Sequence, residues 1–161
     1  MQGDPISSQQ PEITGLDGFV GSYQHTLDGK KRLTIPADWR EMVGVPRRLF
    51  ILPGINVKCL CVYPARDMAP RLETLRKVSI VDEKAKQFAR TLAVRADLSS
   101  WDVQGRIRIK DELLEYASVE KQVVLVGAFS SFEIWNPDEW NKNSGSMDDS
   151  GLTEAARYAG L

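Results

Sequence analysis

Two stretches of the chain, DGKKRLTIP at Asp28–Pro36 and DVQGRIRIK at Asp102–Lys110, share one pattern: Asp-x-x-x-Arg followed by alternating apolar residues. The similarity extends beyond both stretches at an offset of 74 residues, which becomes 73 after a slip of one residue. It pairs Trp39–Val43 with Leu113–Ala117, Leu49–Leu52 with Val123–Val126, and Cys61–Pro64 with Ile134–Pro137. Matched segments in the same order predict a tandem repeat, with a first copy at residues 22–67 and a second copy at residues 96–140.

Each copy predicts the same series of short elements. A strand at 21–26 or 94–98 leads into the Asp-x-x-x-Arg loop, and a second short strand leaves it with alternate apolar residues on one face. A short helix starts near Pro36 or Asp111, and two apolar strands follow, at 49–52 and 59–63 and at 123–126 and 132–135. These elements predict an α+β fold that is mainly β.

The remaining segments predict tails and a linker. Residues 1–18 are poor in apolar side chains, so we expect a disordered tail, and we expect a flexible C-terminal tail at 141–161 with a short helix at 152–158. Apolar residues at helical spacing predict a helical linker over 68–95 that packs on the domains. The linker breaks near 79–82, where Asp82 suits the N-cap of a second helix.

Composition restricts the partners. The 161 residues carry 21 basic and 22 acidic side chains, for a net charge of -1, which argues against a wholesale polycation. Without the two tails, 19 basic and 16 acidic side chains remain, so the body carries +3. A mildly basic body is compatible with an anionic partner.

The sequence offers no constellation for catalysis or metal binding. It contains one histidine, His25, and neither a GxxxxGK[ST] nor a GxGxxG loop. Cys59 and Cys61 share a strand face at a spacing too wide for ordinary disulfide geometry, and with one histidine they match no recognised zinc motif. We therefore expect no enzyme, no cofactor and no metal.

Apolar stretches are too short for a membrane span and a signal peptide pattern is missing, so we expect a cytoplasmic protein. We expect the tryptophans to pack in the core rather than to stack on nucleic-acid bases: Trp39, Trp101, Trp135 and Trp140.

The Asp-x-x-x-Arg loops are the candidate site. An aspartate four residues before an arginine can pair with it across a tight loop and aim the guanidinium outward. Gly29 and Gly105 supply the positive φ that such loops need, so we predict loop-organising roles for Asp28, Gly29, Asp102 and Gly105. Arginine suits bidentate contacts with phosphate or guanine, and the predicted DNA contacts are Lys30, Lys31, Arg32, Arg106 and Arg108. The alternative is that the Asp–Arg pairs merely close the loops or bridge to another subunit.

These residues resemble a known family. Phe19-x-Gly-x-Tyr-x-His-x-Leu-Asp28, Arg32-Leu-x-Ile-Pro36, Asp102-x-x-Gly-Arg106 and Phe132-Glu-Ile-Trp135 are similar to the MraZ family of bacterial transcriptional regulators. The resemblance implies two AbrB-like swapped-hairpin domains that form one pseudo-twofold small barrel, assembled into ring oligomers. It implies binding to G-rich direct repeats of double-stranded DNA upstream of the protein's own division and cell-wall operon, with repression of that operon on the nucleoid. Among the site residues, it implies roles for Asp28, Lys30, Arg32, Asp102, Gly105 and Arg106.

One departure from the family concerns the first loop. Lys31 stands where the family has glycine, so a positive φ there would strain the backbone by about 1 kcal/mol, unless Gly29 shifts the turn. Two other functions stay open: an oligomeric protein-binding scaffold whose Asp–Arg loops close subunit interfaces, and another AbrB-type regulator such as an antitoxin. The doubled motif argues against the second.

Overall fold

The computed structural model describes residues 18–144 and 148–161, so the tail predicted at 1–18 lies outside it except for Gly18. The described chain is α+β, as expected, but more of its residues lie in helices than in strands, so the expectation of a mainly β fold is wrong. Its elements are β1 (Ser22–Thr26), β2 (Arg32–Thr34), α1 (Ala37–Val43), β3 (Leu49–Pro53), β4 (Cys59–Pro64), α2 (Ala65–Val81), α3 (Glu83–Arg95), β5 (Asp97–Ser99), β6 (Arg106–Arg108), α4 (Asp111–Tyr116), β7 (Gln122–Gly127), β8 (Phe132–Trp135), α5 (Pro137–Ser144) and α6 (Asp149–Tyr158).

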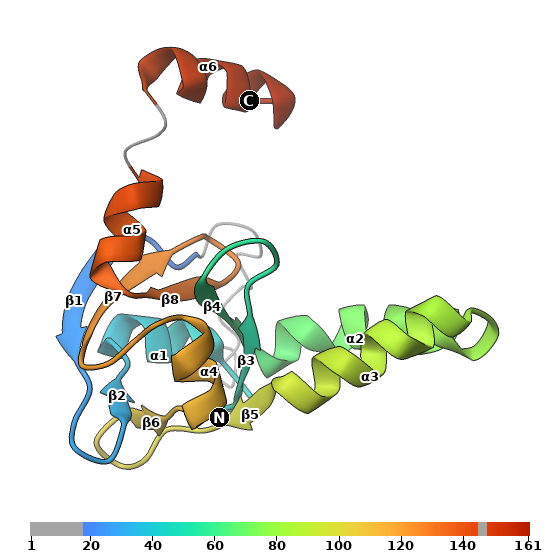
Figure 1. Ribbon diagram of the computed structural model, residues 1–161, viewed down its shortest axis with the longest axis horizontal. Coiled ribbons are helices and arrows are strands. Elements are labelled where there is room, and N and C mark those ends of the chain that lie inside the picture. The colour runs from blue at the N-terminus through green and yellow to red at the C-terminus, as the bar shows by residue number, and fades with distance from the viewer. Residues whose placement is uncertain (1–17, 145–147) are drawn as a thin grey trace, which may run out of the picture.

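The strands form an antiparallel six-stranded sheet, in the order β1-β7-β8-β4-β3-β5, and a separate ribbon of β2 and β6 (Figure 1). The sheet has pseudo-twofold order: exchanging the corresponding strands of the two copies gives the same sheet read from its other edge. The first strands, β1 and β5, occupy the edges, and the last strands, β4 and β8, pair at the centre. The first strand of each copy pairs with the third strand of the other, as β1 with β7 and β5 with β3. The two copies therefore share one sheet.

The expected pseudo-twofold small barrel is not formed, because the six-stranded sheet is open. Each edge strand pairs on one side only, β1 with β7 and β5 with β3, and the β2–β6 ribbon makes its own ladder instead of closing the gap.

The main core lies between the sheet, the ribbon and the short helices α1 and α4. Leu33, Ile35, Ile107 and Ile109 are fully buried, which confirms that the alternation in β2 and β6 marks their inner face. Trp39 packs against Phe132 in this core, with 4.8 Å between ring centroids. A smaller cluster on the opposite face of the sheet contains Cys59, Val124 and Trp135, with Cys61, Val126 and Trp140 partly buried against it. Trp101 is partly buried against the main core, so the tryptophans have the packing roles expected of them.

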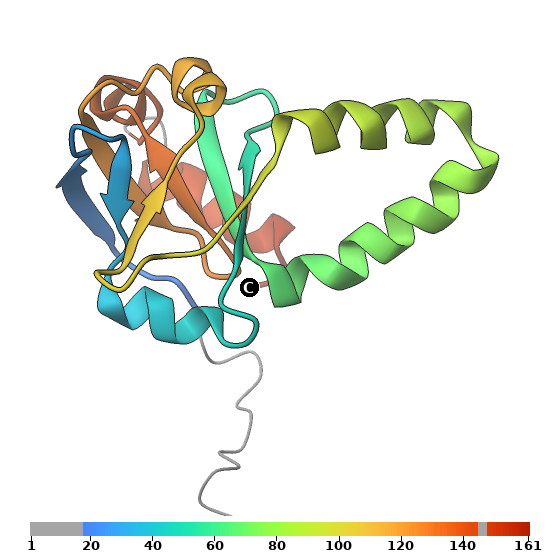
Figure 2. The same ribbon diagram turned by 90° about the horizontal axis from the view of Figure 1, so that it is seen from below.

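The predicted linker forms a helical hairpin, α2 and α3, that projects from the body (Figure 2). Asp82 caps α3 as expected, because its Oδ1 accepts from the backbone N–H groups of Lys84 and Ala85 at 2.8 and 3.3 Å. Met68 is the one buried residue of α2 and α3 has none, so most of the hairpin does not pack on the body.

The structure also shifts some predicted boundaries. The helix α3 continues to Arg95, which delays the strand expected at 94–98 to Asp97–Ser99. Residues 141–144, expected in a flexible tail, belong to α5, whose first turn is capped by Asn136 through the backbone N–H groups of Asp138 and Glu139. The short C-terminal helix is longer than the expected 152–158, because Asp148 caps it. None of the helices in the described ranges is long and apolar enough to cross a membrane.

Candidate nucleic-acid interface

The two Asp-x-x-x-Arg loops have the same hydrogen-bond pattern. Asp28 Oδ1 accepts from the backbone N–H groups of Lys30 and Arg32, each at 2.9 Å, and Asp28 Oδ2 accepts from Arg32 Nε at 2.6 Å. Asp102 repeats these bonds with Gln104 N at 2.9 Å, Arg106 N at 3.0 Å and Arg106 Nε at 2.9 Å. The predicted pairing of aspartate with arginine across each loop is confirmed.

The same bonds keep both carboxylates ionised. The backbone N–H of Arg32, followed by its side chain, lowers the pKa of Asp28. The equivalent N–H of Arg106 lowers the pKa of Asp102 to about 2. Each loop therefore holds a fixed negative charge that orients its arginine.

The left-handed residue of each loop is the one before the arginine. Gly105 has a φ of 79° and the equivalent Lys31 has a φ of 60°. Gly29 is absent from the positive-φ residues, so its expected role in supplying that conformation is wrong. The first loop keeps the geometry of the second and places the strain, about 1 kcal/mol, on Lys31.

The two arginines are held differently, and the expected outward-facing guanidinium is not found for Arg106, which two aspartates bind. Arg106 places Nε and Nη2 on Asp102 Oδ2, each at 2.9 Å, and its Nη1 lies 3.9 Å from Asp28 Oδ2. This contact joins the loops of the two copies. Arg32 is bound through Nε, and its Nη groups make no hydrogen bond or ion pair within the described residues.

A hollow of about 490 Å³ beside the first loop collects positive charge. Antiparallel pairing of β2 with β6 places Arg32 directly opposite Arg108, so that one end of the ribbon carries both arginines. Within the described chain, the side chains of Lys30 and Arg108 are exposed and form no ion pair. The hollow is lined by four basic side chains and one acidic side chain, and we call it the basic hollow. Its lining residues are Gly29, Lys30, Lys31, Arg32, Arg108 and Asp111.

Sequence reasoning missed two residues around the loops. Asp111 pairs with Lys31, at 2.9 Å between Nζ and Oδ1, and this contact lowers the pKa of Asp111. The guanidinium of Arg40 lies against Gly105, where an added Cβ would approach its Cζ to 2.6 Å. Both contacts cross between the copies, so no local spacing reveals them.

Comparisons with known proteins show which family the chain resembles. A family model described as "MraZ protein, putative antitoxin-like" matches residues 92–159, which include the second loop. A protein of Clostridium acetobutylicum named Transcriptional regulator MraZ is 33% identical over 144 residues, covering 89% of this chain and 99% of the relative. The equally named protein of Thermomicrobium roseum is 36% identical over 146 residues, covering 89% and 99%. That of Moorella thermoacetica is 39% identical over 124 residues, covering 77% and 85%.

These relatives carry the name of a regulator rather than of an enzyme. The identities of 33–39% extend over 77–89% of this chain and 85–99% of the relatives. The resemblance found in the sequence is thereby confirmed, and the chain belongs to the MraZ family of transcriptional regulators.

Proposed function

We propose that this protein regulates transcription by binding double-stranded DNA through the basic hollow and the outer face of the β2–β6 ribbon. The observation that carries the proposal is the hollow itself, where Lys30, Lys31, Arg32 and Arg108 gather around a single lining carboxylate. A two-stranded ribbon fits the major groove, and clustered basic side chains bind phosphate by releasing counterions.

The contacts divide into two roles. Lys30 and Arg108 are exposed and form no ion pair with any residue that the structure describes, so they contact phosphate or base edges. The Nη groups of Arg32 offer a fork that Asp28 holds in place. Lys31 adds charge, reduced by its pair with Asp111. Arg106 is bound by two aspartates and serves mainly to lock the second loop to the first.

One hollow makes too small a contact for tight binding, so we propose that several subunits act together. A ring of this chain presents several hollows, and direct G-rich repeats spaced near one helical turn place equivalent grooves on one face of DNA. In this proposal the two copies are AbrB-like domains, with 68–95 as a helical linker. The ring occludes the promoter of the protein's own division and cell-wall operon in the cytoplasm, on the nucleoid.

The test is a titration of the full-length protein with DNA from upstream of its own gene, at several salt concentrations, against a scrambled duplex. We expect preference for the upstream DNA, loss of binding in Arg32→Ala with the oligomer intact, and weaker binding in Arg108→Ala. Each lost phosphate contact lowers the slope of log K against log salt by about 0.9. Lys86→Ala is the matched control, because this exposed lysine lies on the projecting hairpin. Unchanged affinity and salt slope in Arg32→Ala and Arg108→Ala would refute the assignment.

Two other outcomes distinguish the remaining functions. Assembly without binding to either duplex would favour a protein-binding scaffold, although the Asp–Arg pairs are already satisfied within one chain. Equal binding to both duplexes would favour an AbrB-type regulator with another target, such as an antitoxin.

A further inference from the structure

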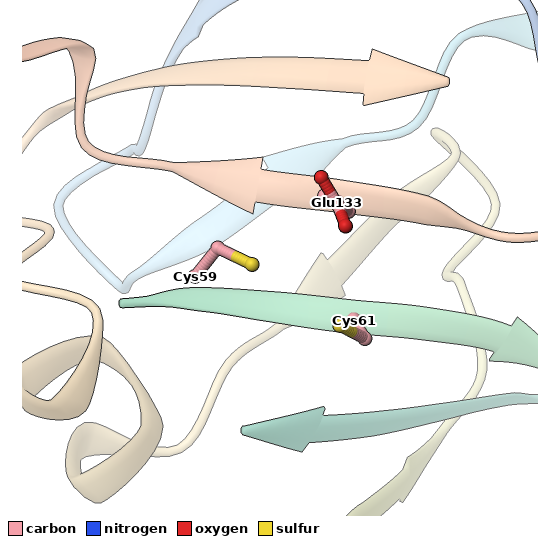
Figure 3. Close-up of side chains that lie close together, drawn as sticks. All are labelled: Cys59, Cys61 and Glu133. Atoms are coloured by element: carbon pink, nitrogen blue, oxygen red, sulfur yellow. The ribbon is translucent and has the colours of Figure 1, made fainter. Parts of the chain in front are cut away.

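Three potential metal ligands meet on the face of the sheet opposite the main core (Figure 3). Cys59 and Cys61 project from the same face of β4, and Glu133 lies on the adjacent strand β8, directly opposite Cys61 in the register. The two Sγ atoms and a carboxylate oxygen of Glu133 all lie within 4.8 Å of one another. Both cysteines are free thiols.

The surroundings of these groups resemble a preformed site. Cys59 is fully buried and belongs to the same cluster as Trp135, against which Trp140 packs. Glu133 Oε1 accepts a hydrogen bond from Trp135 Nε1 at 2.9 Å, which orients the carboxylate. Hydrogen bonds of this kind commonly fix metal-binding side chains in position. The second oxygen of Glu133 accepts no hydrogen bond within the described residues.

We propose that Cys59, Cys61 and Glu133 bind a thiophilic divalent cation, zinc being the best match, with three protein ligands and an open fourth position. Two sulfurs and one oxygen suit zinc, whereas magnesium and calcium prefer oxygen alone. Tetrahedral zinc, with bonds of about 2.0–2.3 Å, separates its ligand atoms by about 3.5 Å. The three donors therefore need to close by about 1 Å, which side-chain rotation can supply.

Binding is balanced in charge and protons. The cation replaces the two thiol protons, which leave to solvent, and forms two bonds to sulfur and one to the Glu133 oxygen. A dication with two thiolates and one carboxylate leaves a single negative charge at the edge of a half-buried cluster. An exchangeable water occupies the fourth position.

The site joins the two sequence copies. The cysteines belong to the first copy, Glu133 belongs to the second, and their strands β4 and β8 form the central pair of the sheet. A bound cation would tie these strands together. Neither copy holds the three ligands alone, so spacing within one motif could not reveal the site. The inference is independent of the proposed DNA binding.

The test uses the reduced, metal-free full-length protein, titrated with Co²⁺ alone and then with Zn²⁺. We expect one Co²⁺ per chain, with a thiolate-to-cobalt charge-transfer absorption that Zn²⁺ displaces, and a melting temperature that rises with Zn²⁺ concentration. We expect Cys61→Ser to abolish the absorption and Glu133→Gln to weaken Co²⁺ binding at least tenfold. Glu120→Gln removes an exposed carboxylate elsewhere and should behave as wild type.

Other results would overturn the proposal. No charge-transfer absorption, with both thiols titratable by a thiol reagent, would exclude the site. Loss of binding in Cys61→Ser together with unchanged binding in Glu133→Gln would reduce it to a two-thiol site and exclude the third ligand. Circular dichroism of each variant before titration separates loss of the site from loss of the fold, and Glu133→Gln retains an acceptor for Trp135 Nε1.

Discussion

Replacing Gly105 with alanine should destabilise the protein, while the same replacement at Gly29 should not. The two glycines occupy different positions of equivalent loops. Gly105 has a φ of 79° and lies against Arg40. Gly29 lacks a positive φ, and apart from its chain neighbours no described residue has an atom within 4 Å of where its Cβ would be. Both loops contain a glycine and the same Asp–Arg pair. Comparing the two alanine variants therefore isolates the need for a left-handed conformation at residue 105.

The cost at Gly105 has two sources. A left-handed conformation costs a residue with a Cβ about 1–2 kcal/mol. The new Cβ would lie 2.6 Å from Arg40 Cζ, and the Arg40 side chain must therefore move. This movement weakens or breaks the hydrogen bond of 3.1 Å that Arg40 Nε donates to the Ile35 carbonyl. That bond is worth about 0.5–1.5 kcal/mol. Alanine also restricts the unfolded chain, which returns about 0.4–1 kcal/mol. We therefore expect the free energy of unfolding to fall by about 0.5–3 kcal/mol.

Urea unfolding followed by tryptophan fluorescence measures the difference. Gly105→Ala should lower the unfolding midpoint without changing the slope, and the melting temperature should fall by about 2–4 °C per kcal/mol lost. Gly29→Ala should stay within about 0.5 kcal/mol of wild type or gain slightly. If both variants lose the same free energy, the assignment of the left-handed position to residues 31 and 105 is wrong.

Three further results are expected. Lys31→Gly should leave the unfolding free energy within about 0.5 kcal/mol of wild type, because relief of backbone strain offsets the loss of the ion pair with Asp111, which is about half exposed. The slope of log K for DNA against log salt should fall by up to about 0.9 in this variant, and an unchanged slope would remove Lys31 from the interface. Since the pKa of Asp102 is depressed to about 2, its stabilising effect is present above its ordinary pKa of 3.8 and lost as pH falls towards 2. Between these pH values the unfolding free energy of Asp102→Asn should vary less with pH than that of wild type. Parallel curves of unfolding free energy against pH would contradict the pairing of Asp102 with Arg106. Arg106→Ala should lower stability more than Arg108→Ala, because Arg106 contacts two carboxylates while Arg108 forms no ion pair within residues 18–144 and 148–161. Urea midpoints in the reverse order would be inconsistent with these contacts.

Local patterns in the sequence predicted the local structure well. The period-two alternation placed Leu33 and Ile107 in the core, and the Asp-x-x-x-Arg spacing predicted the pairing within each loop. Asp82 was identified as a helix cap because its partners lie two and three residues away. Each of these features depends on side chains close together in the chain.

The sequence could not predict which distant strands pair, because local patterns report only on residues close together in the chain. The reciprocal pairing of β1 with β7 and β5 with β3 joins residues about a hundred and about fifty apart, and no periodicity states which strands meet. The expected barrel failed there, since the edge strands stay apart. The opposition of Arg32 and Arg108 also depends on the register between copies, so the basic hollow was predicted only as two separate sets of cations.

The ribbon is symmetric in its backbone and asymmetric in its charge. Both loops make equivalent hydrogen bonds, yet Lys30 and Lys31 in the first correspond to Gln104 and Gly105 in the second. The end beside the first loop also carries Arg108, whose counterpart in the first copy is the neutral Thr34.

A site with true twofold symmetry would favour a palindromic DNA sequence, because protein and operator symmetry match. A single charged end gives one chain a direction along the duplex instead. If the hollow binds DNA as proposed, each chain reads an asymmetric half-site, and several chains arranged head to tail suit direct repeats rather than inverted ones. Inverting one repeat in the upstream duplex, at constant spacing, should therefore weaken binding more than it would for a symmetric reader, and equal affinity for direct and inverted arrangements would contradict this reasoning.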